Sequence, residues 1–256
     1  MVPWIVLALL MVRLGSLAET AFAYEIVAVE DGGTIAGRVV FVGPIPTLPD
    51  LVISKDQEVC GTAVPAQMLL VSAQHRGVKN TVIALEGIGR GKAPTAQQPM
   101  LDNRTCVMEP RVQAVMVGTM LVIQNSDPFL HTTRGRLPNL KQAFNLVFPR
   151  DAPAREQRIR FPGVIAVHCD THAHMQAYIL SFAHPYFAVT DADGRFEIDQ
   201  VPPGSYTLTA WHEGWRTLAH NQEGRPTYEE PYVLTAEVTV TAGQTSTVEL
   251  QLASRD

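Results

Sequence analysis

The residues of this chain best suited to chemistry lie between positions 169 and 175, where a thiol, an imidazole and a thioether are spaced three residues apart. They belong to Cys169, His172 and Met175. These are ligand types that a soft metal such as copper prefers. One further ligand would complete a mononuclear site, and the best candidate is His131, which follows an apolar run and a turn. The sequence therefore predicts one metal ion held by four side chains.

Two strand-like runs flank this ligand stretch. Residues 163–167 precede it and residues 177–182 follow it, so the three ligands are expected on a short loop between two strands. His131 would reach the site from an opposite strand. Strands fix ligand side chains better than free loops do, which suits a preorganised metal site.

The same loop carries a second imidazole, His174, which complicates the ligand set. It could compete as an alternative ligand or simply face water, and we expect it to face water.

The loop resembles that of a known family. Residues 163–175 resemble the ligand loop of the cupredoxins, most closely the amicyanins, which share the Cys-x-x-His-x-x-Met spacing and a His before the Cys. The run Val-x-x-Gly-Thr-x-Leu-x-Ile-x-Asn at 115–125 resembles the cupredoxin strand that delivers the first His ligand. The resemblance covers roughly residues 95–183. It implies a plastocyanin-like Greek-key β-sandwich.

The cupredoxin resemblance also implies a role for each ligand. One copper ion would form a type 1 (blue) site with His131, Cys169, His172 and Met175. The thioether of Met175 would tune the potential. His172, expected nearest the surface of the loop, would be the port through which electrons enter and leave.

The C-terminal part of the chain resembles a second family. Residues 190–196 and 201–206 resemble carboxypeptidase regulatory-like domains, whose fold is transthyretin-like, over roughly residues 186–254. The strand and Gly-Pro turn near residues 37–46 look like the usual beginning of such a domain. We therefore expect residues 34–90 and 186–254 to build one sandwich, with the cupredoxin-like part, 95–183, inserted into it.

Periodicity favours an all-β chain. Apolar residues at helical spacing are not sustained after Ala23, whereas short alternating runs are frequent. Residues 68–71 and 78–85 are expected to be strands. Residues 131–160 carry seven basic and two acidic side chains and are expected to form a solvated loop, with a docking face for an acidic redox partner as the alternative.

The first 23 residues predict export. An apolar run ends in Ala21-Phe22-Ala23, which is typical of a cleaved signal peptide and implies a periplasmic or secreted protein with no transmembrane segment after cleavage. If Cys169 binds metal, Cys60 and Cys106 remain as a candidate disulfide, or as two buried small hydrophobes. The net charge of −5 shows no nucleic-acid footprint.

These features predict a carrier of single electrons between a redox donor and acceptor. Four protein ligands leave no open position for a substrate, and the motifs Gly-x-Ser-x-Gly and His-Glu-x-x-His are absent, so we expect no enzymatic activity. Two alternatives stay open. The protein could store or deliver copper, or it could be a non-enzymatic binding module with a vestigial copper loop.

Overall fold

The computed structural model describes residues 24–96, 98–222 and 224–255. The predicted signal peptide, 1–23, lies outside these residues. Strands dominate the described chain, and α1 (Gln57–Cys60) is its single helix, so the all-β prediction is confirmed. Within the same residues, no helix is long and apolar enough to span a membrane.

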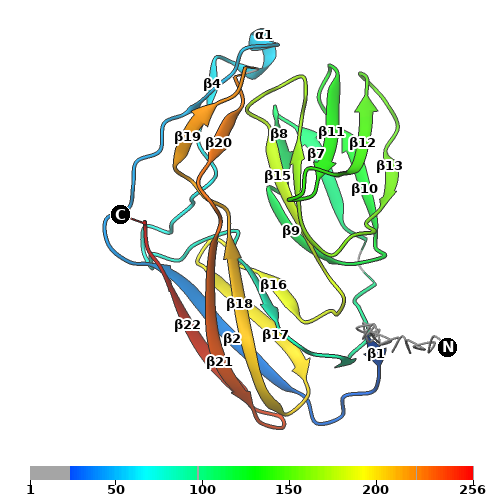
Figure 1. Cartoon of the computed structure of the whole chain (residues 1–256), viewed down its shortest axis with the longest axis vertical. Coiled ribbons are helices and arrows are strands. Elements are labelled where there is room, and N and C mark those ends of the chain that lie inside the picture. Colours follow the sequence, from blue (N-terminus) through cyan, green and yellow to red (C-terminus); the bar gives the residue numbers. More distant parts are fainter. Residues whose placement is uncertain (1–23, 97, 223, 256) are drawn as a thin grey trace, which may run out of the picture.

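The first sandwich is built from strands at both ends of the chain (Figure 1). One sheet has the order β16-β5-β18-β21 and the other the order β17-β2-β22. The chain leaves this sandwich after β5 and returns at β16, and β2 pairs with β17 and β22 alone. The strands, in chain order, are β2 (Gly33–Phe41), β5 (Val82–Leu85), β16 (Phe187–Val189), β17 (Arg195–Val201), β18 (Gly204–His212), β21 (Tyr232–Val240) and β22 (Thr245–Leu252).

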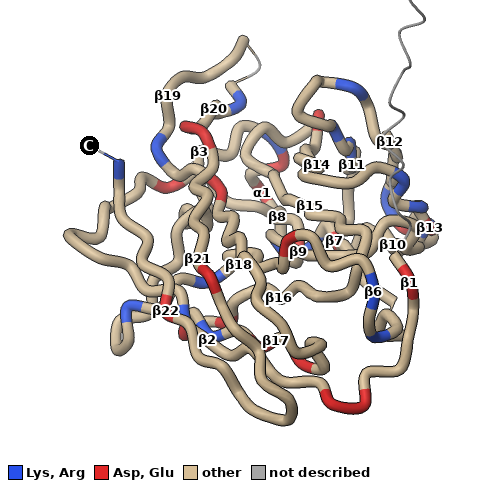
Figure 2. Tube along the Cα trace, turned by 60° about the horizontal axis from the view of Figure 1, so that its bottom comes forward, with Lys and Arg blue, Asp and Glu red and all other residues tan. Residues whose placement is uncertain are grey.

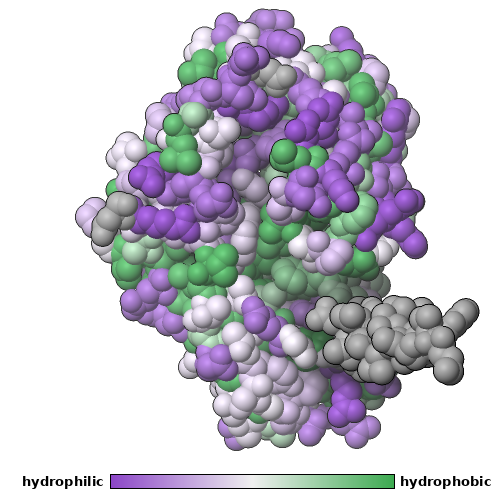
Figure 3. All heavy atoms as spheres, viewed as in Figure 1, coloured by the Kyte–Doolittle hydropathy of each residue, from purple (hydrophilic) through white to green (hydrophobic). Residues whose placement is uncertain are grey.

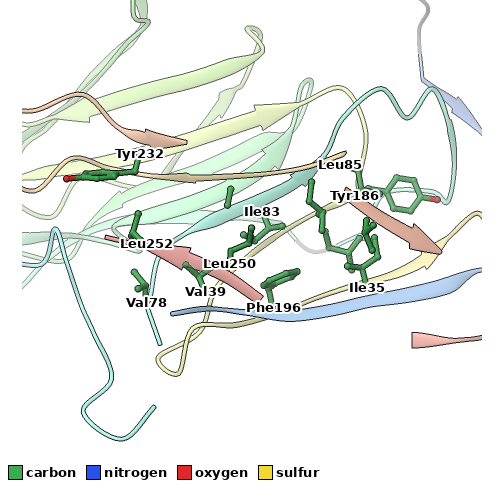
Figure 4. Close-up of a cluster of buried hydrophobic side chains, with 14 of the residues drawn as sticks. Ile35, Val39, Val78, Ile83, Leu85, Tyr186, Phe196, Tyr232, Leu250 and Leu252 are labelled. Carbon is green, nitrogen blue, oxygen red and sulfur yellow. The ribbon is translucent and has the colours of Figure 1, made fainter. Parts of the chain in front are cut away.

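Side-chain alternation along the strands forms the core of the first sandwich. In β2, Ile35, Val39 and Phe41 point inward and are buried. They meet Phe196 of β17 and Leu250 of β22 in one apolar cluster (Figure 4). Burial of branched and aromatic side chains on one face of each sheet holds the two layers together.

The second sandwich consists of the intervening strands. One sheet has the order β13-β10-β7-β8 and the other the order β12-β11-β14-β15-β9. The strands, in chain order, are β7 (Met100–Arg104), β8 (Val107–Glu109), β9 (Val112–Met116), β10 (Met120–Asn125), β11 (His131–Arg136), β12 (Gln142–Phe148), β13 (Arg155–Arg158), β14 (Gly163–His168) and β15 (Gln176–Phe182). The core of this sandwich is a separate cluster that includes Phe148, Ile165, Ile179 and Leu121.

Two local predictions were wrong. Residues 131–160 form three strands, β11 to β13, rather than a solvated loop. Their arginines occupy the outward positions, and buried residues such as His131, Phe144 and Phe148 occupy the inward ones. Residues 68–71 form no strand, and Val71 makes only an isolated bridge with Val78. The strand expected at 78–85 is confined to β5, because the chain turns at Asn80, whose φ is 64°.

Apolar and ionic contacts join the two sandwiches. Val82 and Trp211 of the first pack with Val112 and Leu180 of the second. Beside them, the Arg111 guanidinium donates two hydrogen bonds to the Glu213 carboxylate, at 2.6 and 2.7 Å, and both residues are buried. Apolar residues gather across the middle of the molecular face in Figure 3, whereas its upper end is mainly hydrophilic.

Short elements project from the first sandwich along one end of the second (Figure 1). They are the ribbon of β3 (Leu51–Val52) and β4 (Ala63–Val64) with α1 between them, and the hairpin of β19 (Thr217–His220) and β20 (Pro226–Tyr228). A disulfide between Cys60 and Cys106 ties α1 to the β7–β8 turn. Elsewhere, β1 (Glu25–Ile26) pairs with β6 (Arg90–Gly91).

Candidate metal centre

His131, Cys169 and His172 converge in the second sandwich, at the end that α1 covers. The Cys169 Sγ lies 3.6 Å from His131 Nδ1 and 3.7 Å from His172 Nδ1. All three residues are buried, and they form the one group of three metal-ligating side chains of the His, Cys, Asp and Glu types found among the described residues. A site of this kind can hold a copper ion.

The separations suit a first-row metal ion. Metal–nitrogen and metal–sulfur bonds of about 2.0 and 2.3 Å, at an angle near 120°, would place the nitrogen and sulfur about 3.7 Å apart. The two measured S···N distances, 3.6 and 3.7 Å, lie close to this value. The three ligand atoms therefore fit an ion with little rearrangement.

Strand ends and a closed loop position these side chains. His131 is the first residue of β11, and Cys169 directly follows β14. The loop closes on itself, because Cys169 N–H donates to the Met175 carbonyl (3.3 Å) and Met175 N–H donates to the His172 carbonyl (3.1 Å). Met175 is buried and belongs to the same apolar cluster as Cys169. The thioether is thus held in the interior, beside the loop that carries the other ligands.

A buried carboxylate orients His131. The Nε2 of His131 lies 3.0 Å from Asp127 Oδ2, so an N–H there leaves Nδ1 free to bind metal. The same carboxylate accepts hydrogen bonds from the backbone N–H groups of Thr105 (2.7 Å) and Cys106 (2.9 Å). Both residues have positive φ, 54° and 61°, which aims successive N–H groups at one anion. Asp127 is therefore fixed by the backbone before any metal binds.

A second carboxylate, from outside the second sandwich, orients His172. Its Nε2 lies 2.8 Å from Asp56 Oδ2. Asp56 is the N-cap residue of α1, but its side chain makes no capping hydrogen bond and turns to His172 instead. The expectation that His172 lies nearest the surface is wrong, because its side chain is 0% exposed. The edge of the His172 ring, where we expected electrons to enter and leave, is therefore shielded from solvent.

Hydrogen bonds shift the proton equilibria of the site. Burial alone would raise the pKa of the Cys169 thiol, but hydrogen bonds from His131 and His172 lower it to about 5. Burial alone would lower the pKa of His131, but its contacts with Asp127 and Cys169 raise it. Burial alone would raise the pKa of Asp127, but its hydrogen bonds with His131 and with the backbone of Cys106 and Thr105 lower it. The metal-free site therefore holds a thiolate, the form of Cys that binds metals.

The other histidines of the loop point away from the three ligand atoms. His174 is buried, and its Nε2 lies 2.9 Å from the Cys106 carbonyl oxygen, so it neither faces water as expected nor joins the ligand group. Burial, with nearby arginines, lowers the pKa of His168 to about 4, so this imidazole is neutral. The Phe129 ring covers the site, with its centroid 5.0 Å from His131 and 5.4 Å from His172.

Sequence reasoning missed the residues that surround the ligands. Asp127 lies four residues before His131 in the turn already singled out, so an acid at that spacing was an available signal. Asp56 is 116 positions from His172 and has no local signal. The candidate disulfide residues, Cys60 and Cys106, are joined in the structure.

Comparison with known proteins finds the resemblance of the C-terminal part again. Residues 180–253 match the family model described as a carboxypeptidase regulatory-like domain. A search among curated proteins found no match.

Similar solved structures include cupredoxins and a Cu-containing nitrite reductase. A novel purple cupredoxin from Nitrosopumilus maritimus is 18% identical, with 33% of this chain and 100% of that chain covered and a TM-score of 0.29. A Cu-containing nitrite reductase from Thermus scotoductus is 19% identical, with 36% and 24% covered and a TM-score of 0.29. Amicyanin from Paracoccus versutus is 11% identical, with 34% and 84% covered and a TM-score of 0.30.

Proposed function

We propose that this chain is an exported type 1 copper protein that carries single electrons between a redox donor and a redox acceptor. The observation that supports this most is the buried set of His131 Nδ1, His172 Nδ1 and Cys169 Sγ at S···N distances of 3.6 and 3.7 Å. Two imidazoles and a thiolate, with a weak thioether, are the ligands of blue-copper electron-transfer sites. Met175 supplies that thioether in the proposed site.

The chain's own residues keep the site in one arrangement. A copper ion bound there would take up and release one electron. Asp127 and Asp56 fix the two imidazole rings from behind, and the backbone bonds between Cys169 and Met175 fix the loop. A ligand set that cannot relax favours neither oxidation state strongly, which keeps the rearrangement on electron transfer small.

The cover over His172 favours electron carriage over copper delivery. A delivery protein must release its ion to an acceptor, whereas Asp56 closes this site from outside and a disulfide ties its helix in place. Four protein ligands would also leave no position for a substrate, so we propose no enzymatic activity. The Cys60–Cys106 disulfide supports an oxidising compartment, the periplasm or the exterior.

Metal analysis with an optical spectrum and a redox titration tests the proposal. The copper-loaded protein should bind one ion, show an intense visible thiolate-to-copper band, and cycle reversibly with one electron. Cys169→Ser should abolish the band. His174→Gln is the matched control and should keep it, because that imidazole bonds to the Cys106 carbonyl. A colourless copper complex would refute the type 1 site, and irreversible reduction would refute electron carriage.

A further inference from the structure

A cavity of about 560 Å³ lies between the second sandwich and the β19–β20 hairpin, on the far side of the Cys169 backbone from the metal ligands. Residues of β11 and β14, the turn after β11, and Asn221 and Arg225 of the hairpin line it. This volume falls in the range of small-molecule binding sites, about 300–1,000 Å³. The site described above uses none of its volume.

The lining of this cavity is strongly basic. Arg134, Arg136 and Arg225 contribute three guanidinium groups, and Asp170 is the single carboxylate among the described lining residues. Asp170 already pairs with Arg134 at 2.7 Å. Basic residues gather around β11, β12 and β20 in Figure 2. The described lining therefore holds more cationic than anionic groups, which favours an anion.

Polar atoms with no partner point to the same ligand class. The Nε of Arg134 and the Nδ1 of His168 are buried and have no hydrogen-bond partner among the described residues. Buried polar groups are nearly always satisfied, so an unpaired guanidinium N–H beside a cavity indicates a missing acceptor. Planar guanidinium groups match the oxygens of carboxylates and phosphates.

We propose that this cavity binds a small oxyanion of the phosphate or carboxylate class. Its position between a sheet face and a hairpin fits a small ion better than the flat surface of an acidic protein. Anion binding in this cavity does not require a metal ion at the other site.

The cavity is also connected to the proposed copper ligand. His168 and Asp170 flank Cys169 in the chain, and Arg225 donates a hydrogen bond to the Cys169 carbonyl. The Asp170 N–H donates to Thr132 Oγ1 (2.6 Å), and that hydroxyl lies 3.8 Å from Cys169 Sγ. A bound anion adds negative charge close to the thiolate and favours the more positive metal ion. This coupling rests on the proposed function, and it makes anion binding lower the reduction potential.

Calorimetric titration of the full chain with inorganic phosphate tests the binding, with and without copper. We expect one saturable site, weakened about tenfold in Arg136→Gln, because the anion loses a charge-assisted hydrogen bond to the guanidinium group. Arg150→Gln removes an exposed arginine outside the cavity and should leave binding unchanged. Asp170→Asn removes the opposing carboxylate and should tighten binding, a gain that misfolding cannot produce.

Several outcomes would overturn the proposal. Absence of saturation, equal effects of the two arginine variants, or binding of polyglutamate without phosphate would each remove the small-anion site. With copper bound, saturating phosphate should lower the potential in the wild type and not in Arg136→Gln. An unchanged potential would overturn the coupling alone. A protein that binds phosphate but no copper would refute the proposed function and leave the anion site standing.

Discussion

The two histidines of the metal centre are held by aspartates that reach them in different ways. Asp127 comes from the second sandwich itself, lies four residues from His131, and is fixed by two backbone N–H groups. Asp56 comes from a helix that projects from the first sandwich, and its side chain is 32% exposed. One contact belongs to the scaffold of the site, and the other belongs to a cover over it.

The comparison distinguishes two sides of the candidate metal site, a scaffold side that contains Asp127 and a cover side that contains Asp56. A single disulfide, Cys60–Cys106, connects the cover to the β7–β8 turn that also anchors Asp127. Changes on the scaffold side should affect both the free energy of unfolding and the metal affinity. Changes on the cover side should affect mainly how fast the metal exchanges.

Removal of the disulfide, in Cys60→Ser/Cys106→Ser, should have the largest effect on stability. The two residues are 46 positions apart, and the chain-entropy model gives a loss of about 4 kcal/mol in the free energy of unfolding. Urea unfolding of the metal-free protein measures it. The Cys106 N–H stays in place, so the blue band should persist while a chelator removes copper faster. An unchanged rate of removal would show that the cover holds without its covalent tie.

Loss of the scaffold carboxylate, in Asp127→Ala, should rank second. It leaves the N–H groups of Thr105 and Cys106 and the Nε2 of His131 without their acceptor, at a cost of about 3 kcal/mol in unfolding free energy. Copper affinity should fall about 10–100-fold, measured by competition with a chelator. Asp127→Asn keeps one acceptor oxygen, so its stability and copper affinity should lie between those of the wild type and those of Asp127→Ala. If Asp127→Ala destabilises no more than Asp56→Ala, the distinction between the two sides is wrong.

The thiolate of the metal-free protein should titrate far below an ordinary thiol. The folded pKa of Cys169 is about 5, against an ordinary value of 9.0, so ultraviolet absorbance should give a midpoint near pH 5. A lowered thiol pKa adds stability that is complete above the ordinary value and is lost as the pH falls through 5. The raised pKa of His131 has no effect on stability below its ordinary value of 6.5, because this imidazole is then protonated in both the folded and the unfolded chain.

Unfolding free energy should therefore rise with pH between 5 and 6.5 in the metal-free wild type. Cys169→Ser is the control and should show a smaller slope, because buried histidines with lowered pKa values, among them His168 and His212 at about 4, still contribute below pH 6.5. A midpoint near 9 would show that the imidazoles do not stabilise the thiolate.

The smallest effect on stability is expected from Asp56→Ala. The Asp56 carboxylate is partly exposed, and its hydrogen bond to His172 contributes about 1 kcal/mol or less. Copper should nevertheless exchange faster, because the Nε2 of His172 loses its acceptor and its cover. Asp50→Ala, an exposed aspartate before the same ribbon, is the matched control in a chelator assay. Equal exchange in the two variants would show that Asp56 does not close the site.

The spacing in the sequence singled out three residues that the structure brings together, His131, Cys169 and His172, but not the residues that surround them. Cys169 and His172 share one short loop with Met175, so their side chains could be grouped from the sequence. The strand β11 was missed because its outward positions carry arginines, and the alternation with buried His131 and Thr133 is weak as a hydrophobic signal. The Asp56–His172 contact spans 116 positions and depends on how the ribbon folds back over the site, which no local pattern encodes.

The buried Arg111–Glu213 pair restricts how the two sandwiches can be recombined with those of other proteins. Each sandwich contributes one member, and excision of either would leave the other's charge stranded in a nonpolar interior, a defect of about 3–5 kcal/mol. Neither sandwich can be exchanged for that of a relative unless positions 111 and 213 are changed together. A chimera that joins the second sandwich to a foreign protein would need a carboxylate in that protein to pair with Arg111.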